Sequence, residues 1–381
     1  MPIALFNART LIDDALIDGR AVIVAGGMIV AVVAEAEIPA DAERYDLDGA
    51  ILAPGFIDSQ VNGGGGVLFN DAPTVETIAT IGAAHRRYGT TGFLPTLISD
   101  DLATVRAGVA AVDAAIAAGV PGVLGIHIEG PFLNVDRKGI HDADKIIALD
   151  DDGIAAITGL KRGVTLVTLA PERTNPAMIT RLARAGVIVA AGHTDGSYDE
   201  ISAALTAGMS GFTHLFNAMS PLTAREPGAV GAALDAKAWC GLIVDGRHVH
   251  PATLRIAAMA NPDRLMLVTD AMPSVGQVDK SFMLQGHYVQ VIDGVCINDD
   301  GTLAGSDLDM ASAVRNAQAL MGVSPVAALT MASRNPACFL GLGQKIGRIA
   351  AGFRADLVVL TDDGRVHSSW IDGRVRAHDQ R

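Results

Sequence analysis

The sequence predicts an α/β protein in which a (β/α)8 barrel of the TIM type is combined with a small β-sandwich formed by both chain ends. Between residues 51 and 343, short apolar runs rich in Val, Ile and Leu alternate with helical segments, as in successive β/α units. Residues 1–50 and 344–381 instead carry strand-like segments separated by turn residues. The length of 381 residues exceeds one ordinary domain but fits a barrel of roughly 250 residues plus a smaller unit.

Both chain ends have the same β-rich character. The N-terminal strand-like stretches are IALFNARTLI, GRAVIVAGGMIVAVV and RYDLDGAIL. In the C-terminal segment, Asp-Gly pairs at 363–364 and 372–373 separate the strands, because this dipeptide suits a tight hairpin turn. We therefore predict one sandwich domain built from both ends, with boundaries near residues 51 and 344.

Eight short runs are predicted to be the parallel strands of the barrel, because each is dense in apolar and β-branched residues. They are ILAPGFIDSQ, TGFLPTL, GVLGIHIE, VTLVTLAPE, VIVAAGH, GFTHLF, CGLIVDG and LMLVTDA.

Helical stretches lie between these runs. Residues 74–89 and 103–119 have apolar residues at helical spacing and end at glycine, and residues 311–322 and 324–334 predict the last helices. Residues 281–299 interrupt the alternation because they are strand-like and follow the eighth strand. We expect a β-hairpin here, inserted over the face of the barrel that carries the active site.

Composition excludes several classes of function. No apolar run reaches the ~18 residues of a membrane-spanning helix, and the N-terminus does not resemble a signal peptide, so a cytoplasmic protein is expected. The net charge of -13, from 29 basic and 42 acidic residues, argues against nucleic acid or an anionic membrane as partner. The three cysteines are widely spaced in apolar surroundings, which indicates buried thiols rather than disulfides.

Polar residues end several of the predicted strands. Glu129, His193 and His214 follow the third, fifth and sixth runs, and Asp270 follows the eighth. The carboxyl ends of barrel strands share one rim, so these side chains are expected to meet there. Two histidines and a carboxylate form a three-ligand catalytic metal site, whereas a structural zinc site usually has four ligands and is rich in Cys. Taken singly, a histidine at a strand end is more often a hydrogen-bonded structural residue, so the prediction rests on the joint pattern.

Asp270 is predicted to be the general base. It follows a strongly apolar strand, where an unpaired carboxylate would be costly, and a water molecule at the metal would give it a partner. The alternative is that Asp270 caps the next segment, but Pro273 and Gly276 indicate a loop there rather than a helix.

Several motifs resemble one known family. EGPFLN followed by KGIH, then AGHTDGS, THLFNAMSPLTAREPGAVGA, DGRHVHP, LVTDAM and GTLAGS are similar in order and spacing to the N-acetylglucosamine-6-phosphate deacetylases of the amidohydrolase superfamily. The likeness covers most of the chain. The THLFNAM and REPG block is specific to this group, whereas the terminal IGRIAAGFRADLVVL pattern is widespread among amidohydrolases.

The resemblance implies roles for individual residues. It makes Glu129, His193 and His214 the metal ligands, Asp270 the catalytic acid and base, and His141 the residue that polarises the acetyl carbonyl. The remaining implied substrate contacts are Gln60, Ile140, Asn217, Ala218, Arg225, His248, Leu303, Ala304 and Gly305. Asn217 and Ala218 would contact the sugar phosphate, and Leu303 to Gly305 would line the sugar pocket. Arg225 and His248 match positions that reach the substrate from a neighbouring subunit, which implies a homodimer.

One motif departs from the wider superfamily. Many amidohydrolases carry His-x-His after the first strand to hold a second metal, but this chain has Gln60, Val61 and Asn62 there. Amides are poor ligands for divalent transition metals compared with imidazole. We therefore expect one divalent ion per subunit, zinc in the first place, with Fe2+, Co2+ and Mn2+ as alternatives.

The expected reaction is metal-assisted hydrolysis of N-acetylglucosamine 6-phosphate, an amino-sugar phosphate, to glucosamine 6-phosphate and acetate. The alternatives are a deacetylase of another N-acetylhexosamine phosphate or of an N-acyl amino acid, and a non-catalytic scaffold related to amidohydrolases. The complete set of Glu129, His193, His214 and Asp270 argues against the scaffold.

Overall fold

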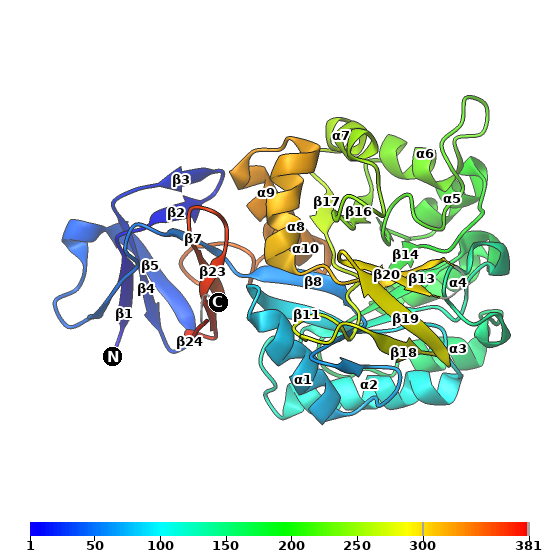
Figure 1. The fold of residues 1–381 in the computed structure, drawn as a ribbon, viewed down its shortest axis with the longest axis horizontal. Helices are drawn as coiled ribbons and strands as arrows, with labels where there is room; N and C mark the ends of the chain where they lie inside the picture. The colour runs from blue at the N-terminus through cyan, green and yellow to red at the C-terminus, as the bar shows by residue number, and fades with distance from the viewer. Residues whose placement is uncertain (299–300, 379–381) are drawn as a thin grey trace.

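The computed structural model describes residues 1–298 and 301–378 and has two parts, a small β domain that contains the N-terminal end and a larger barrel (Figure 1). The β domain has a four-stranded and a six-stranded sheet. In sheet order, the four strands are β5 (Met28–Ala34), β4 (Arg20–Ala25), β1 (Ile3–Phe6) and β6 (Glu43–Asp46). The six are β24 (Arg374–Ala377), β23 (Val366–Ile371), β22 (Leu357–Leu360), β7 (Ile51–Pro54), β2 (Arg9–Ile12) and β3 (Ala15–Ile17).

The two sheets of the β domain share one apolar core. Leu5 and Val22 from the four-stranded sheet pack with Leu52, Leu357 and Trp370 from the six-stranded sheet, and all are buried. Because N-terminal and C-terminal strands lie side by side in the six-stranded sheet, the predicted sandwich of both chain ends is confirmed.

Eight parallel strands form the barrel sheet, as predicted. In sheet order they are β17 (Leu265–Leu267), β16 (Trp239–Leu242), β15 (Gly211–Phe212), β14 (Ile188–Ala191), β13 (Val164–Leu169), β12 (Gly125–Glu129), β11 (Thr90–Leu97) and β8 (Phe56–Val61). The first predicted run is divided between the two parts, because β7 pairs with β22 in the β domain and β8 pairs with β11 in the barrel. We therefore propose Gly55 as the first junction between the domains.

Helices cover the outside of the barrel sheet (Figure 1). They are α1 (Val75–Arg86), α2 (Leu102–Ala117), α3 (Asp151–Ile157), α4 (Pro176–Arg184), α5 (Tyr198–Thr206), α6 (Gly228–Asp235), α7 (Pro251–Ala260), α8 (Met310–Asn316), α9 (Pro325–Ala332) and α10 (Arg334–Phe339). Polar caps fix several helix starts: Thr74 accepts a hydrogen bond from Thr77 N, and Ser197 forms a capping box with Glu200. Short 3-10 turns η1 (Glu35–Glu37), η2 (Val135–Arg137), η3 (Ala143–Lys145) and η4 (Pro171–Arg173) and the π-helical turn η5 (Ala317–Met321) complete the helical elements.

The barrel closes at the rim formed by the carboxyl ends of its strands. Beyond the end of β17, Asp270 N donates to Gln60 O at 3.0 Å, and Asn62 N donates to Ala271 O at 3.0 Å. Within the same seam, the buried carboxylate of Asp58 accepts a 2.5 Å hydrogen bond from Thr269 Oγ1. The segment that carries Asp270 is therefore held directly against β8.

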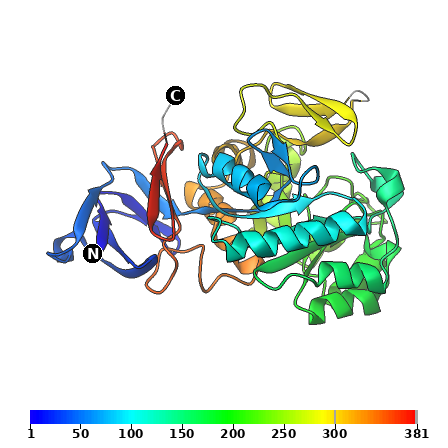
Figure 2. The ribbon, with the colours of Figure 1, turned by 90° about the horizontal axis from the view of Figure 1, so that it is seen from below.

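The stretch at 281–299 is more than the predicted hairpin, and its last residue lies outside the described residues. It contributes to an antiparallel sheet of four strands, β18 (Phe282–Leu284), β19 (His287–Ile292), β20 (Val295–Asn298) and β21 (Leu303–Ser306). The two-residue loops at 285–286 and 293–294 both have positive φ, which makes two tight turns instead of one. This insert lies as a separate layer beside the barrel (Figure 2) and packs on it through Ile98 and Met272.

The glycine-rich hairpin of β9 (Gly63–Gly64) and β10 (Val67–Leu68) follows β8. Among the described residues, no helix combines the length and the apolar character needed to span a bilayer.

We predict that Gly125→Ala destabilises the protein. A Cβ atom at Gly125 would lie 1.9 Å from the carbonyl oxygen of Val164 on the neighbouring strand, so β12 and β13 would have to separate. Such overpacking typically costs ~1–3 kcal/mol. Thermal denaturation should show a lower midpoint for Gly125→Ala than for the control Gly159→Ala, whose Cβ would meet no atom nearer than 3.4 Å. Equal midpoints would contradict the strand packing described.

Candidate active site

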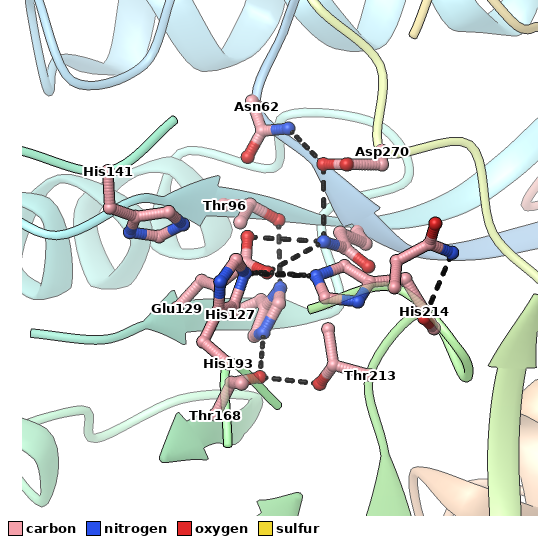
Figure 3. A network of polar contacts seen from close by, with 12 residues as sticks. Asn62, Thr96, His127, Glu129, His141, Thr168, His193, Thr213, His214 and Asp270 are labelled. Atoms are coloured by element: carbon pink, nitrogen blue, oxygen red, sulfur yellow. Dashed lines mark hydrogen bonds and ion pairs between the residues drawn. The ribbon is translucent and has the colours of Figure 1, made fainter. Parts of the chain in front are cut away.

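The carboxyl ends of four barrel strands bring Glu129, His193, His214 and Asp270 together (Figure 3). Glu129 is the last residue of β12, and the other three follow β14, β15 and β17. His193, His214 and Asp270 have left-handed backbones with φ of 50°, 32° and 52°. This conformation turns each chain sharply at the rim, where the side chains meet (Figure 3).

Three donor atoms lie close enough to share one metal ion. His214 Nε2 lies 2.9 Å and His193 Nε2 lies 3.3 Å from Glu129 Oε1, and the two nitrogen atoms are 3.1 Å apart. A tetrahedral ion with bonds of about 2.0–2.1 Å holds its ligand atoms about 3.3 Å apart, so these spacings fit one ion. Within the described parts of the chain, no other group of three or more His, Cys, Asp or Glu side chains is placed to hold an ion.

The protonation of the donor set also fits a metal. His193 Nδ1 lies 2.9 Å from the carbonyl oxygen of Arg137, which can only accept, so Nδ1 carries a ring proton and Nε2 is the nitrogen that faces Glu129 and His214. Burial opposes ionisation of Glu129, but hydrogen bonds from His193 and His214 and their charges outweigh it and hold its pKa well below the usual value. The site therefore presents imidazole nitrogen and ionised carboxylate, which are ligands that zinc accepts.

Asp270 is oriented by two amides. Asn62 Nδ2 and Gln60 Nε2 both donate to Asp270 Oδ1, at 2.6 and 3.2 Å, and no described residue hydrogen-bonds to Oδ2. Gln60 Nε2 also lies 3.0 Å from Glu129 Oε1. Burial and the charge of Glu129 raise the pKa of Asp270 to about 6. Asp270 is therefore a stronger base than an exposed aspartate, with one oxygen free to accept a proton.

His141 is held as a neutral hydrogen-bond donor. The backbone N–H of Ser99 donates to His141 Nδ1 at 3.1 Å, so the ring proton is on Nε2. Burial and the charge of His193 lower the pKa of His141 well below its usual value. Its ring lies 4.4 Å from that of His193, centroid to centroid, so the Nε2–H donor belongs to the same site.

A cavity of about 260 Å3 brings most of the predicted site residues together. Its lining includes Glu129, Ile140, His141, His193, His214, Asn217, Ala218, His248, Asp270, Leu303 and Gly305. Ala304 is fully buried and packs with Met272 in the apolar cluster under the insert. The expectation that His248 reaches the site from a neighbouring subunit is wrong, because His248 lines the cavity of its own chain.

Arg225 does not reach the cavity of its own chain. It lies in an exposed turn closed by the hydrogen bond from Thr223 N to Glu226 O at 3.1 Å. Glu226 Oε1 accepts from Tyr198 N at 3.1 Å, so Glu226 fastens the turn to α5 instead of pairing with Arg225. No ion pair or hydrogen bond joins the Arg225 side chain to the rest of the described chain.

Sequence reasoning missed two residues of the site. His127 lies in β12 two positions before Glu129, so strand alternation alone places both on the same face. Its ring nitrogens lie 3.2 Å from Thr96 Oγ1 and 2.7 Å from Thr168 Oγ1, and burial lowers its pKa to about 4. His127 is therefore a neutral support beneath the donor set and not a ligand (Figure 3). Ser99 contacts His141 Nδ1 through its hydroxyl at 2.8 Å and its backbone N–H at 3.1 Å, and it was missed because it lies 42 residues away outside any motif.

The chain matches known families over nearly its whole length. The amidohydrolase family model matches residues 51–376, and the model of the NagA composite domain matches residues 3–52. An N-acetylgalactosamine-6-phosphate deacetylase of Shewanella sp. (strain ANA-3) is 43% identical over 97% of this chain and 94% of that protein. An N-acetylglucosamine-6-phosphate deacetylase of Haemophilus influenzae is 32% identical over 98% of this chain and 99% of that protein.

A solved structure gives the same result. The crystal structure of N-acetylglucosamine-6-phosphate deacetylase from Pasteurella multocida matches with a TM-score of 0.96 and 34% identity, covering 99% of this chain and 100% of that one. The resemblance seen in the motifs is confirmed, and the chain belongs to the amidohydrolase family.

Proposed function

We propose that this protein is a metal-dependent deacetylase that hydrolyses N-acetylglucosamine 6-phosphate to glucosamine 6-phosphate and acetate. The observation that carries the proposal is a buried Glu129, His193 and His214 donor set that shares one cavity with Asp270. The similarity to deacetylases across almost the full chain gives this site its substrate class. The proposal includes a cytoplasmic location and a homodimer.

One divalent ion per subunit is proposed, held by Glu129, His193 and His214, with zinc first and Fe2+, Co2+ or Mn2+ as alternatives. When bound, such an ion supplies Lewis acidity, which polarises a carbonyl and makes water a stronger acid. Gln60 uses its amide N–H groups on Glu129 and Asp270, so it acts as a donor between two carboxylates. This supports a single-ion site in which Gln60 and Asn62 replace the imidazoles of a second one.

Asp270 is proposed as the acid and base of the reaction. Its free Oδ2 accepts a proton from the attacking water, and the carboxyl group then returns that proton to the departing amine nitrogen. Asn62 and Gln60 on Oδ1 keep the other oxygen aimed at the substrate throughout. His141 donates its Nε2–H to the oxyanion that forms at the acetyl carbonyl, because Ser99 fixes the tautomer that carries this proton.

The phosphate is proposed to lie near His248, Asn217 and Ala218. His248 Nδ1 lies 2.6 Å from Asp245 Oδ2, a contact that fixes the orientation of the ring. Ala218 N has no acceptor among the described residues, and Ala218 lines the cavity. Arg225 is proposed to complete the phosphate site of a neighbouring subunit, which its exposed turn would allow.

A second substrate is supported by a specific observation. The Shewanella relative at 43% identity is named for N-acetylgalactosamine 6-phosphate. The two sugars differ only in the configuration at carbon 4, away from the acetamide and the phosphate. The same residues could therefore perform the same chemistry on either epimer. An N-acyl amino acid is less well supported, because it carries no phosphate and the two relatives are named for sugar phosphates.

We predict that the purified protein releases acetate from both sugar phosphates, with one favoured by kcat/KM. Activity should disappear after chelation and return with one equivalent of zinc per chain. The measurements are kcat/KM for acetate release from each epimer and the metal content of the same preparations by elemental analysis. A metal-loaded protein that releases no acetate from either substrate would refute the proposed function.

We predict that Asp270→Asn lowers kcat by ~10³ while metal content stays at the wild-type level, because an amide cannot take the proton of water. The amide oxygen can still accept from Asn62 and Gln60, so the fold around residue 270 should be kept. Steady-state kinetics, metal analysis and a thermal midpoint are the measurements. More than a tenth of wild-type turnover would remove Asp270 from this role.

We predict that Arg225→Ala lowers kcat/KM for N-acetylglucosamine 6-phosphate by ~10², with little effect on the slow hydrolysis of N-acetylglucosamine. The reason is that arginine can pair with two phosphate oxygens. Arg184→Ala, at an exposed arginine on α4, is the matched control and should behave like wild type.

A hybrid experiment tests the position of Arg225 across the subunit boundary. Dimers of one Arg225→Ala chain and one Asp270→Asn chain should contain one working site, because each site takes Arg225 from the opposite chain. No recovery of activity in verified hybrids would place Arg225 within its own subunit, and equal losses on both sugars would remove it from the phosphate site.

A further inference from the structure

Two hydrogen bonds from the η2 turn, which follows β12, hold His193 in place. Asn134 N donates to His193 O at 2.9 Å, and Arg137 O accepts from His193 Nδ1 at 2.9 Å. The turn η2 therefore fixes both the left-handed backbone of His193 and the orientation of its ring. A non-glycine residue keeps such a backbone only where its surroundings enforce it.

The carboxylate of Glu172, outside the cavity, accepts hydrogen bonds both from this turn and from the segment that follows His193. Glu172, in η4 after β13, uses Oε1 to accept from Asn134 Nδ2 at 2.9 Å and from Asp195 N at 2.8 Å. Its Oε2 accepts from Thr194 Oγ1. Glu172 thus receives donors from the loops that follow two candidate metal ligands, Glu129 and His193.

An ion pair between these loops is a weaker side-chain link. Arg137 pairs with Asp195, but the two side chains are 35% and 47% exposed, and exposed ion pairs contribute little. Glu172 is half-buried, and hydrogen bonds to a charged acceptor are stronger than neutral ones. The geometry therefore makes Glu172 the main side-chain support for the two direct hydrogen bonds between the η2 turn and His193.

We propose that Glu172 is a positioning residue for the metal centre. By holding Asn134, Thr194 and Asp195 together, it keeps the carbonyl of Arg137 under the His193 ring and His193 Nε2 beside Glu129. Glu172 itself is not among the residues that line the cavity. This inference rests on the proposed metal-dependent function.

The test compares Glu172→Ala and Glu172→Gln with wild type and with Asp46→Ala. The glutamine oxygen can still accept from Asn134 and Asp195, and its amide can donate to Thr194. Asp46 is a matched control in the β domain, because it accepts from an asparagine amide, Asn7 Nδ2 at 2.7 Å, and from a backbone N–H, Asp48 N at 2.9 Å. Each full-length protein is loaded with Co2+, its visible absorption is recorded, and its Kd is measured against a competing chelator. The thermal midpoint of each metal-free protein is measured in parallel.

Glu172→Ala should weaken Co2+ binding by ~10–100-fold and alter the visible spectrum, because loss of an outer partner misorients a ligand. Glu172→Gln should recover most of the affinity, and Asp46→Ala should match wild type. If Glu172→Ala does not fold, Thr194→Val should shift affinity and spectrum in the same direction, because it keeps the side-chain shape and removes the hydroxyl that donates to Glu172 and accepts from Gly196 N.

Two results would overturn the inference. A variant that binds Co2+ with wild-type affinity and spectrum, while its metal-free midpoint falls, would make Glu172 a purely structural residue. If wild type itself binds no Co2+, the proposed function fails together with this inference, whereas normal binding by wild type and variants alike refutes the inference alone.

Discussion

The site depends on holding strained backbone at the ends of barrel strands. His193, His214 and Asp270 all have positive φ, a conformation that costs about 1–3 kcal/mol at a non-glycine residue. Hydrogen bonds from neighbouring strands fix these turns: Leu215 N donates to Gly241 O at 2.8 Å beside His214, and Ser306 N donates to Asp270 O at 2.9 Å. Chemistry at the rim is therefore linked to strand register, because a slipped strand would release the turn it supports.

Charge imposes the second constraint. Glu129 is buried and Asp270 is half-buried, and two carboxylates this close repel each other unless donors or cations intervene. Gln60 donates to both of them, and the histidines stabilise the charge on Glu129. An imidazole at position 60 could bind a metal, but it could not supply two amide protons from one nitrogen. Glutamine in place of histidine at position 60 therefore disfavours a second metal ion and, through its hydrogen bond, orients Asp270, the proposed base.

The sequence predicted the features that depend on local pattern. The barrel strands, the sandwich of both ends and the meeting of Glu129, His193 and His214 follow from apolar runs ending in polar residues. Contacts through backbone groups could not be predicted, because Ser99 N and Arg137 O have no side-chain signature and lie 42 and 56 residues from their histidines. The prediction for His248 was wrong because a motif match indicates the role of a residue but does not show which subunit's cavity the residue lines.

The overall negative charge of the protein opposes the binding of a phosphate group. The chain has a net charge of -13, and screening limits long-range repulsion to about 8 Å at physiological salt. Within that range only local donors count, and the residues described around the cavity include no lysine or arginine. His248 and the backbone N–H of Ala218 alone would leave a doubly charged phosphate undercompensated. Arg225, exposed on a fastened turn without a partner in the described chain, has the charge that this cavity lacks. In the proposed dimer, each subunit would therefore supply the chemistry at its own site and the missing cation at its partner's.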